Sequence, residues 1–236
     1  MGGWHIAHRS TDRDDLIGIV THIKLPNECD CQNDDYGKYN GVFLEFIHGF
    51  YKSCYGIDIG IVYRNEQFQI FYHALNGTCK YSDPIPLNPP VILDVQKGDL
   101  IILRSYINRN GKSLVAEVIK NEKMIGKYET YFTKQASKAY IKGARLNREI
   151  VMAANRKNYI PTNAFFSDTK MFNTMLTNRY YEHIKLSQSN SKLKYFSDEN
   201  NMDSSKYGII VSEEDGYIND MGSCDFRCLK TLSGIV

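Results

Sequence analysis

Residues 99–120 read DLIILRSYINRNGKSLVAEVIK, and this stretch decides the fold. Residues 99–107 and 113–120 both combine the period-two alternation of strands with an excess of apolar, largely β-branched side chains. Arg109-Asn110-Gly111 stands between them, and Asn-Gly is the strongest short signal for a two-residue hairpin turn. The stretch therefore predicts an antiparallel β-hairpin.

The same pattern recurs along most of the chain, and turn residues separate the runs. Helical periodicity is scarce: residues 134–145 suggest one or two helical turns, and 187–206 read as a polar surface loop or insertion. Many short strands with almost no helix between them predict an all-β fold, a two-sheet antiparallel β-sandwich of the jelly-roll, concanavalin A-like type. We expect one domain over 1–236, with its last stretch, 219–236, left unassigned. The other expected strands are 3–8, 16–24, 41–48, 56–63, 67–74, 124–131, 148–153, 180–186 and 207–211.

Composition and net charge limit the classes of binding partner that we expect. The 236 residues are 42% hydrophobic and 24% charged, and the net charge of +2 comes from acids and bases interspersed along the chain. A nucleic-acid or membrane partner is therefore disfavoured. No apolar run approaches the roughly 18 residues of a membrane span, and no signal peptide is seen at the start. The oligomeric state and the compartment stay unknown.

Six cysteines leave three interpretations open. Cys29, Cys31, Cys54, Cys79, Cys224 and Cys228 suit disulfides in an exported protein or free thiols inside a cell. A zinc site from the first two and the last two is a third possibility, although neither spacing is the usual two-residue knuckle. The acidic stretch Asp30–Asp35 lacks the pattern of an EF-hand and reads as a solvated loop, with an irregular calcium site as the alternative. We expect no cofactor and no metal.

Two carboxylates on strands carry the functional hypothesis. In 56–63, Ile57, Ile59 and Ile61 are expected to be buried, which leaves Asp58 on the opposite face of the sheet. The run 148–153 places Glu149 on its outward side in the same way. Such a pair can hold a water molecule, with one carboxylate as base and the other, protonated, polarising a carbonyl group. The simpler interpretation is that both are exposed strand residues.

The order of motifs resembles a known family. YGIDIGIVYRNEQFQIFYHAL at 55–75 is followed by PIPLNPPVILDVQKGDLIILRSYI, GKSLVAEVIKNEKMIGKY, LNREIVMAAN and IPTNAFFS. This layout is similar to that of the glutamic peptidases, both the fungal acid enzymes (eqolisins) and the plant neprosin-like enzymes, which share a concanavalin-like sandwich. The resemblance covers roughly residues 3–170 and rests on order and short motifs.

The resemblance implies specific roles. The family carries an active-site Gln or Glu two positions before a Gly on a strand, where this chain has Asp58 before Gly60, and Glu149 matches the place of the partner Glu. Asp is one methylene shorter, which displaces its carboxyl group by ~1.5 Å. A family member would be a secreted hydrolase acting on a peptide through the concave sheet, or an inactive relative.

Other side chains are candidates for binding. Glu45, Tyr63 and His73 are expected near the groove of Asp58 and Glu149 as substrate contacts. The clustered tyrosines of the same third of the chain suit stacking on sugar rings. The alternatives to a hydrolase are therefore a carbohydrate-binding, lectin-like module with a glycan ligand on the same face, or a non-catalytic interaction protein.

Overall fold

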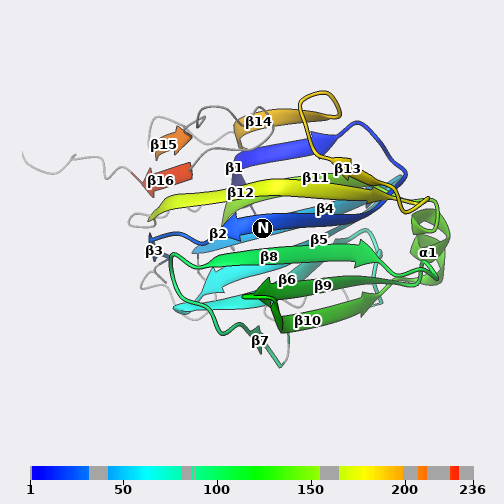
Figure 1. The fold of residues 1–236 in the computed structure, drawn as a ribbon, viewed down its shortest axis with the longest axis horizontal. Helices are drawn as coiled ribbons and strands as arrows, with labels where there is room; N and C mark the ends of the chain where they lie inside the picture. Colours follow the sequence, from blue (N-terminus) through cyan, green and yellow to red (C-terminus); the bar gives the residue numbers. More distant parts are fainter. Residues whose placement is uncertain are drawn as a thin grey trace, which may run out of the picture.

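A computed structural model describes residues 2–31, 42–80, 87, 89–154, 165–198, 207–211 and 224–228. Two antiparallel sheets form a sandwich, which confirms the predicted all-β fold (Figure 1). The sheet that contains β2, β8 and β12, called sheet B, faces the viewer in Figure 1. The sheet that contains β4, β5 and β11, called sheet A, lies behind it. Within the described residues, no helix is long and apolar enough to cross a membrane.

Sheet A has seven strands. Their order across the sheet is β14 (Ser191–Asp198), β1 (Gly2–Thr11), β11 (Arg145–Ala154), β4 (Val42–Lys52), β5 (Tyr55–Arg64), β6 (Gln67–Leu75) and β7 (Val91–Ile92). The two strands that carry Asp58 and Glu149, β5 and β11, flank β4 on its two sides. This order places both residues in one sheet.

Sheet B has nine strands. The main path is β10 (Lys123–Tyr131), β9 (Ser113–Lys120), β8 (Leu100–Ile107), β2 (Leu16–Lys24), β12 (Phe165–Asn178), β16 (Cys224–Cys228) and β15 (Tyr207–Val211), while β3 (Glu28–Asp30) and β13 (His183–Lys185) also pair with β12. The helical turn expected at 134–145 is α1 (Lys134–Tyr140), whose N-cap Thr133 accepts a hydrogen bond from the Ala136 amide.

The predicted hairpin pairs as expected but has a longer turn. Ile107 of β8 lies opposite Leu114 of β9, and residues 108–112 form the connection. Gly111 has a φ of +66° and donates to the Asn108 carbonyl at 2.7 Å, so the turn uses the glycine but not a two-residue geometry. Two positive φ angles in succession, the type I′ pattern, occur at Asn65–Glu66, Asn76–Gly77 and Asn121–Glu122.

The main core fills the space between the sheets. Ile57, Ile59 and Ile61 of β5 are fully buried there, as the alternation predicts. The polar stretch 187–206, expected to be a loop, contains β14, which pairs with β1. Backbone pairing at the edge of the sheet thus outweighs the weak strand propensity of that polar sequence.

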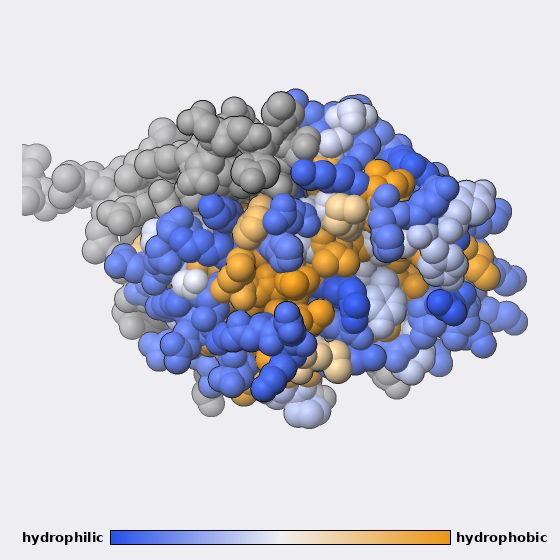
Figure 2. Space-filling model, in the orientation of Figure 1, coloured by the Kyte–Doolittle hydropathy of each residue, from blue (hydrophilic) through white to orange (hydrophobic). Residues whose placement is uncertain are grey.

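The outer face of sheet B carries both exposed apolar side chains and charged ones. Figure 2 shows an apolar area in the middle of this face with hydrophilic residues around it. Leu100 and Met124, on β8 and β10, are each more than half exposed. Beside them Glu117 accepts from Arg104 Nε at 2.7 Å and pairs with Lys127 Nζ at 3.3 Å. This surface is therefore an ordinary exposed sheet face with a charge network.

Candidate functional site

Asp58 and Glu149 lie on the same, outer face of sheet A. Asp58 is opposite Gly49 of β4, and Glu149 is opposite Ile47 of the same strand. The two residues are thus two strands apart and offset by two positions. At typical strand spacing their backbones are about 10 Å apart across the sheet and about 7 Å apart along it. Side chains that lean towards each other above β4 can approach one substrate group from its two sides.

Gly49 leaves room between them. A Cβ atom at this position would lie 2.5 Å from Cε2 of Tyr51 and 2.8 Å from Oδ1 of Asp58. The same position would be 3.2 Å from the Cβ of Asn147 on the other neighbouring strand. The missing side chain of Gly49 therefore creates the space in which Tyr51, Asp58 and Asn147 meet.

Tyr51 binds the carboxylate of Asp58. Its hydroxyl donates to Oδ1 of Asp58 at 2.5 Å. Burial, together with the nearby charges of Asp58 and Glu149, raises the pKa of Tyr51 well above its usual value. The phenol therefore stays protonated and can act as a hydrogen-bond donor. Sequence reasoning counted Tyr51 only among the clustered tyrosines that suit stacking on sugar rings. It did not connect Tyr51 with Asp58, although the period-two series Glu45, Ile47, Gly49 and Tyr51 shares one face of β4.

Residues of sheet A fix the side chain of Glu149. Its side chain is almost fully buried, Asn147 Nδ2 donates to Oε1 at 3.1 Å, and Nε2 of His8 lies 3.7 Å from the same oxygen. Oδ1 of Asn147 is also buried, and none of the described residues donates a hydrogen bond to it. Buried acceptors in proteins are normally hydrogen-bonded, so this oxygen is available to accept from a ligand or a water molecule beside Glu149.

Two further predicted residues share this face. His73 is directly opposite Asp58 across the β5–β6 pair. Glu45 of β4 lies opposite Val151 on one side and Val62 on the other, and it is buried. The structure therefore brings Asp58, Glu149, Glu45 and His73 to one face.

Tyr63 is not part of that group. It belongs to the inward-facing series of β5, is 5% exposed and packs its ring against Phe68 with centroids 4.7 Å apart. Residues that differ by an odd number along a strand point to opposite faces, so Tyr63 cannot share the groove of Asp58. Tyr63 instead lines a cavity at the end of the sandwich.

The face is not the open, solvated groove that the sequence suggested. A second apolar cluster lies beside the carboxylates, and each of its members is 5% exposed or less: Phe43, Ile47, Val62, Phe71, Val151 and Ala153. A ligand that reaches Glu149 must therefore displace protein atoms from this face. A dry surround strengthens the electrostatic interactions of the carboxylates that it contains.

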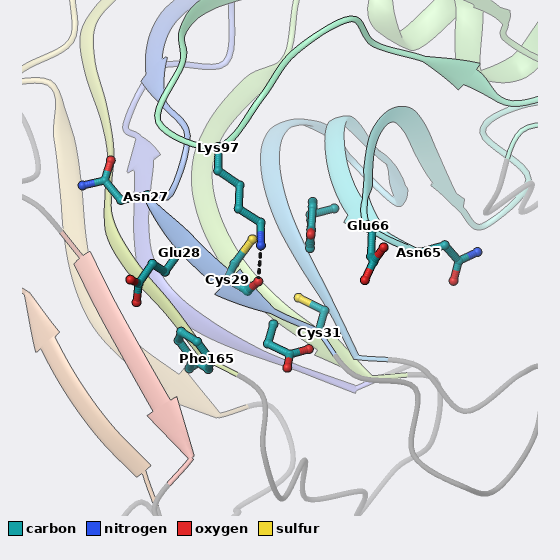
Figure 3. A pocket seen from close by; sticks show the side chains of 10 residues that line it. Asn27, Glu28, Cys29, Cys31, Asn65, Glu66, Lys97 and Phe165 are labelled. Carbon is teal, nitrogen blue, oxygen red and sulfur yellow. Dashed lines mark hydrogen bonds between the residues drawn. The ribbon is translucent and has the colours of Figure 1, made fainter.

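A separate cavity of about 810 Å³ opens at the end of the sandwich (Figure 3). Lys97 reaches across it and donates to the Cys29 carbonyl at 2.8 Å, and its ammonium lies 5.4 Å from the centre of the Tyr63 ring. Burial raises the pKa of the Cys29 thiol to about 11 and also raises that of Cys31. Both thiols are therefore neutral near pH 7. The lining residues are Asn27, Glu28, Cys29, Asp30, Cys31, Tyr63, Asn65, Glu66, Lys97 and Phe165.

The cysteine alternatives are partly resolved. Cys29, Cys31, Cys54 and Cys79 are free thiols. Across the described side chains, no group of three or more His, Cys, Asp or Glu residues is placed to hold a metal ion. The side chains of Cys224 and Cys228 and most of the acidic stretch Asp30–Asp35 lie outside the described residues.

No family model matches the chain, and neither does any curated protein. The fold and the site define a class, an antiparallel β-sandwich with a buried carboxylate cluster on the outer face of one sheet.

Proposed function

We propose that this protein is a hydrolase of the glutamic-peptidase type, which cleaves a peptide through Asp58 and Glu149. The observation that carries the proposal is the contact over Gly49, where Tyr51 donates to Asp58 on the same face of the sheet as Glu149. The buried Oδ1 of Asn147 adds support, because it offers an acceptor to a water or a substrate amide at the same place. Structural packing alone requires none of these polar groups on an outer sheet face.

The reaction divides the work between the two carboxyl groups. Asp58, as carboxylate, takes a proton from a water molecule while the water oxygen forms a bond to the scissile carbonyl carbon. Glu149, in its neutral form, donates a hydrogen bond to the carbonyl oxygen and stabilises the negative charge that develops there. The proton on Asp58 then passes to the departing amine as the C–N bond breaks, so both groups return to their starting states.

Tyr51 positions the shorter carboxylate. The family that this chain resembles has Gln or Glu at the place of Asp58, which reaches further by one methylene. The 2.5 Å hydrogen bond from Tyr51 fixes the orientation of Asp58 in compensation. Asp58→Glu therefore tests whether reach limits the rate: we expect it to keep or raise activity, whereas Asp58→Asn removes the base and abolishes activity.

The experiment is a cleavage assay on a denatured protein substrate between about pH 3 and 7. We expect acid-dependent cleavage that Glu149→Gln abolishes while the circular dichroism spectrum stays unchanged. Glu122→Gln, in the exposed β9–β10 turn, is the matched control and should cleave like the wild type. Absence of cleavage over the whole range, or cleavage that survives Glu149→Gln, contradicts the proposal. Saturable glycan binding that is lost in Asp58→Ala, without cleavage, would favour the lectin-like alternative.

A further inference from the structure

A small cleft at the helix end of the sandwich is lined by two arginines. Its volume is about 80 Å³, and it lies where the β8–β9 turn, the end of α1 and the β12–β13 connection meet. The lining residues are Ile17, Ile107, Asn108, Arg109, Gly111, Tyr140, Ile141, Arg179 and Tyr181. None of these described residues is acidic. In Figure 1 this is the end of the sandwich that carries α1.

Tight local geometry builds the cleft. Gly111 has a φ of +66°, and a Cβ there would lie 3.1 Å from that of Ile141, so the turn packs closely against the end of α1. On the other side, the side-chain oxygen of Asn178 accepts from the amides of Tyr180 and Glu182 at 2.9 and 3.0 Å. This capped turn presents Arg179 next to the cleft.

Aromatic rings hold the two guanidinium groups. Arg109 lies 5.4 Å from the centre of the Tyr181 ring, and Arg179 lies 4.7 Å from that of Tyr180. Arg179 also donates to the Tyr180 hydroxyl. Stacking of this kind orders a guanidinium without neutralising its charge. Both cations are thus ordered in advance for a ligand.

Neighbouring acids do not neutralise these charges. Within the described part of the chain, neither Arg109 nor Arg179 forms an ion pair. The nearby Asp15 accepts two hydrogen bonds from Arg13, which are the main reason that its pKa is lowered, and the charge of Arg179 adds a smaller contribution. Glu182 accepts from Asn178 Nδ2 at 2.6 Å.

We infer that this cleft binds a phosphate or sulfate group. The planar guanidinium fork matches the oxygens of such anions. The volume also fits, because one water takes about 30 Å³ of liquid and the cleft holds roughly two or three, or one small anion. Two lining residues, Ile141 and Tyr181, are 59% and 53% exposed and offer apolar contact to an organic group attached to the anion. The expected ligand is a phosphate or sulfate monoester.

Calorimetric titration of the full-length protein at constant ionic strength tests this site. The probes are inorganic phosphate, inorganic sulfate, phenyl phosphate and phenyl sulfate, with sodium chloride as the reference. We expect saturable binding of the divalent anions, with tighter binding of the phenyl esters. The preference between the two esters identifies the source of the group.

Variants make the test specific. Arg109→Gln and Arg179→Gln should each weaken binding by at least about tenfold, because each removes charge-assisted hydrogen bonds. Lys138→Gln, on α1 and outside the lining, should bind like the wild type. Glu149→Gln should also bind normally, since this site does not depend on the proposed hydrolase activity. Failure of all four probes to saturate, or unchanged binding in Arg109→Gln, overturns the inference.

Discussion

The two faces of sheet A use polar side chains in opposite ways. Arg148 and Glu149 are neighbours on β11, yet Arg148 points into the space between the sheets and Glu149 points outward, and both are almost fully buried. On β4, His48 faces inward while Glu45 faces outward. One pair of strands thus supplies two distinct sets of buried polar groups.

The inward set joins the two sheets. His48 lies between the hydroxyls of Thr21, at 2.9 Å, and Ser105, at 3.0 Å, both from sheet B. Arg148 Nη1 donates to Thr174 of sheet B at 2.6 Å, and Thr174 is 3.1 Å from Thr21. These contacts cross the core and pair one sheet with the other. Their function is structural.

The hydrogen bonds described above for the outward set lie within sheet A. Asp58 accepts from Tyr51, and Glu149 accepts from Asn147. The Tyr51–Asp58 bond joins neighbouring strands of one sheet, and the Asn147–Glu149 bond joins two residues of β11. Neither bond therefore pairs one sheet with the other. The comparison predicts that the inward polar groups set stability and its pH dependence, whereas the outward ones serve the proposed activity.

The largest expected effect is that of Gly60→Ala, on stability. A Cβ atom at Gly60 would lie 1.9 Å from the backbone carbonyl oxygen of Phe46, and backbone cannot move aside as a flexible side chain can. We expect a loss of at least about 3 kcal/mol in the free energy of unfolding, measured by urea denaturation. Gly18→Ala is the control, since its nearest contacts are an ordinary 3.5 Å, and it should change stability by less than about 1 kcal/mol. Equal effects of the two variants would contradict the close approach of β4 and β5.

A smaller effect is expected from pH through His48. Burial, and secondarily the charge of Arg148, lowers the pKa of His48 from 6.5 to about 3. The folded state therefore keeps the imidazole neutral, while the unfolded chain takes up a proton as the pH falls below 6.5. Stability is fully present above pH 6.5 and declines towards pH 3. From pH 7 to 5 the expected loss is about 2 kcal/mol.

A variant separates His48 from the other titrating groups. Burial opposes the ionised form of Asp99 and Glu117, but hydrogen bonds from Lys120 and Arg104 outweigh it and lower the pKa of both carboxyl groups. Protonation of these two groups therefore reduces the stability of the fold only as the pH falls through and below about 4. His48→Gln should therefore remove most of the decline between pH 7 and 5, whereas His22→Gln should keep it. Urea denaturation at both pH values gives the answer. An undiminished decline in His48→Gln would contradict the neutral buried imidazole.

This difference between the faces limits the proposed activity. Catalysis with a neutral Glu149 gains from acid, but the core loses stability in the same direction. The cleavage rate should therefore rise on acidification and then fall as the protein unfolds, and the substrate assay needs an unfolding measurement at each pH.

Tyr51→Phe should have the smallest effect on stability. It removes the hydroxyl that donates to Asp58 and leaves the ring above Gly49. We expect a change in the free energy of unfolding of only about 1 kcal/mol but a loss of about tenfold or more in kcat, since the base is no longer oriented. Tyr55→Phe is the control, on β5 but outside this contact. Unchanged kcat in Tyr51→Phe would show that Asp58 needs no orientation.

Alternation along the strands predicted most of the arrangement. The series Ile57, Ile59 and Ile61 fixed the outward direction of Asp58, and the run 148–153 did the same for Glu149, because side chains on a strand alternate strictly between faces. That both strands flank β4 in one sheet was not readable from the sequence, since it depends on the long-range pairing of β11 with β4. Tyr63 was assigned to the wrong neighbourhood by proximity in sequence, although the same alternation places it inward.

Other features needed the fold. The Arg109 and Arg179 cleft unites residues 70 positions apart, and no local pattern connects them. The burial of the outer face of sheet A was also not predicted, because a period-two pattern identifies two faces but not what each contacts. The apolar residues Ile47, Val62 and Val151 on that face were the available signal.

A double-mutant cycle on the cleavage rate tests the central claim most directly, that Asp58 and Glu149 act together on one peptide bond. The wild type, Asp58→Asn, Glu149→Gln and the double variant are compared at one pH at which all four are folded. Residues that act as a unit are strongly non-additive, so the double variant should be no slower than the slower single variant. Losses that multiply, or a wild type without cleavage, would contradict the account.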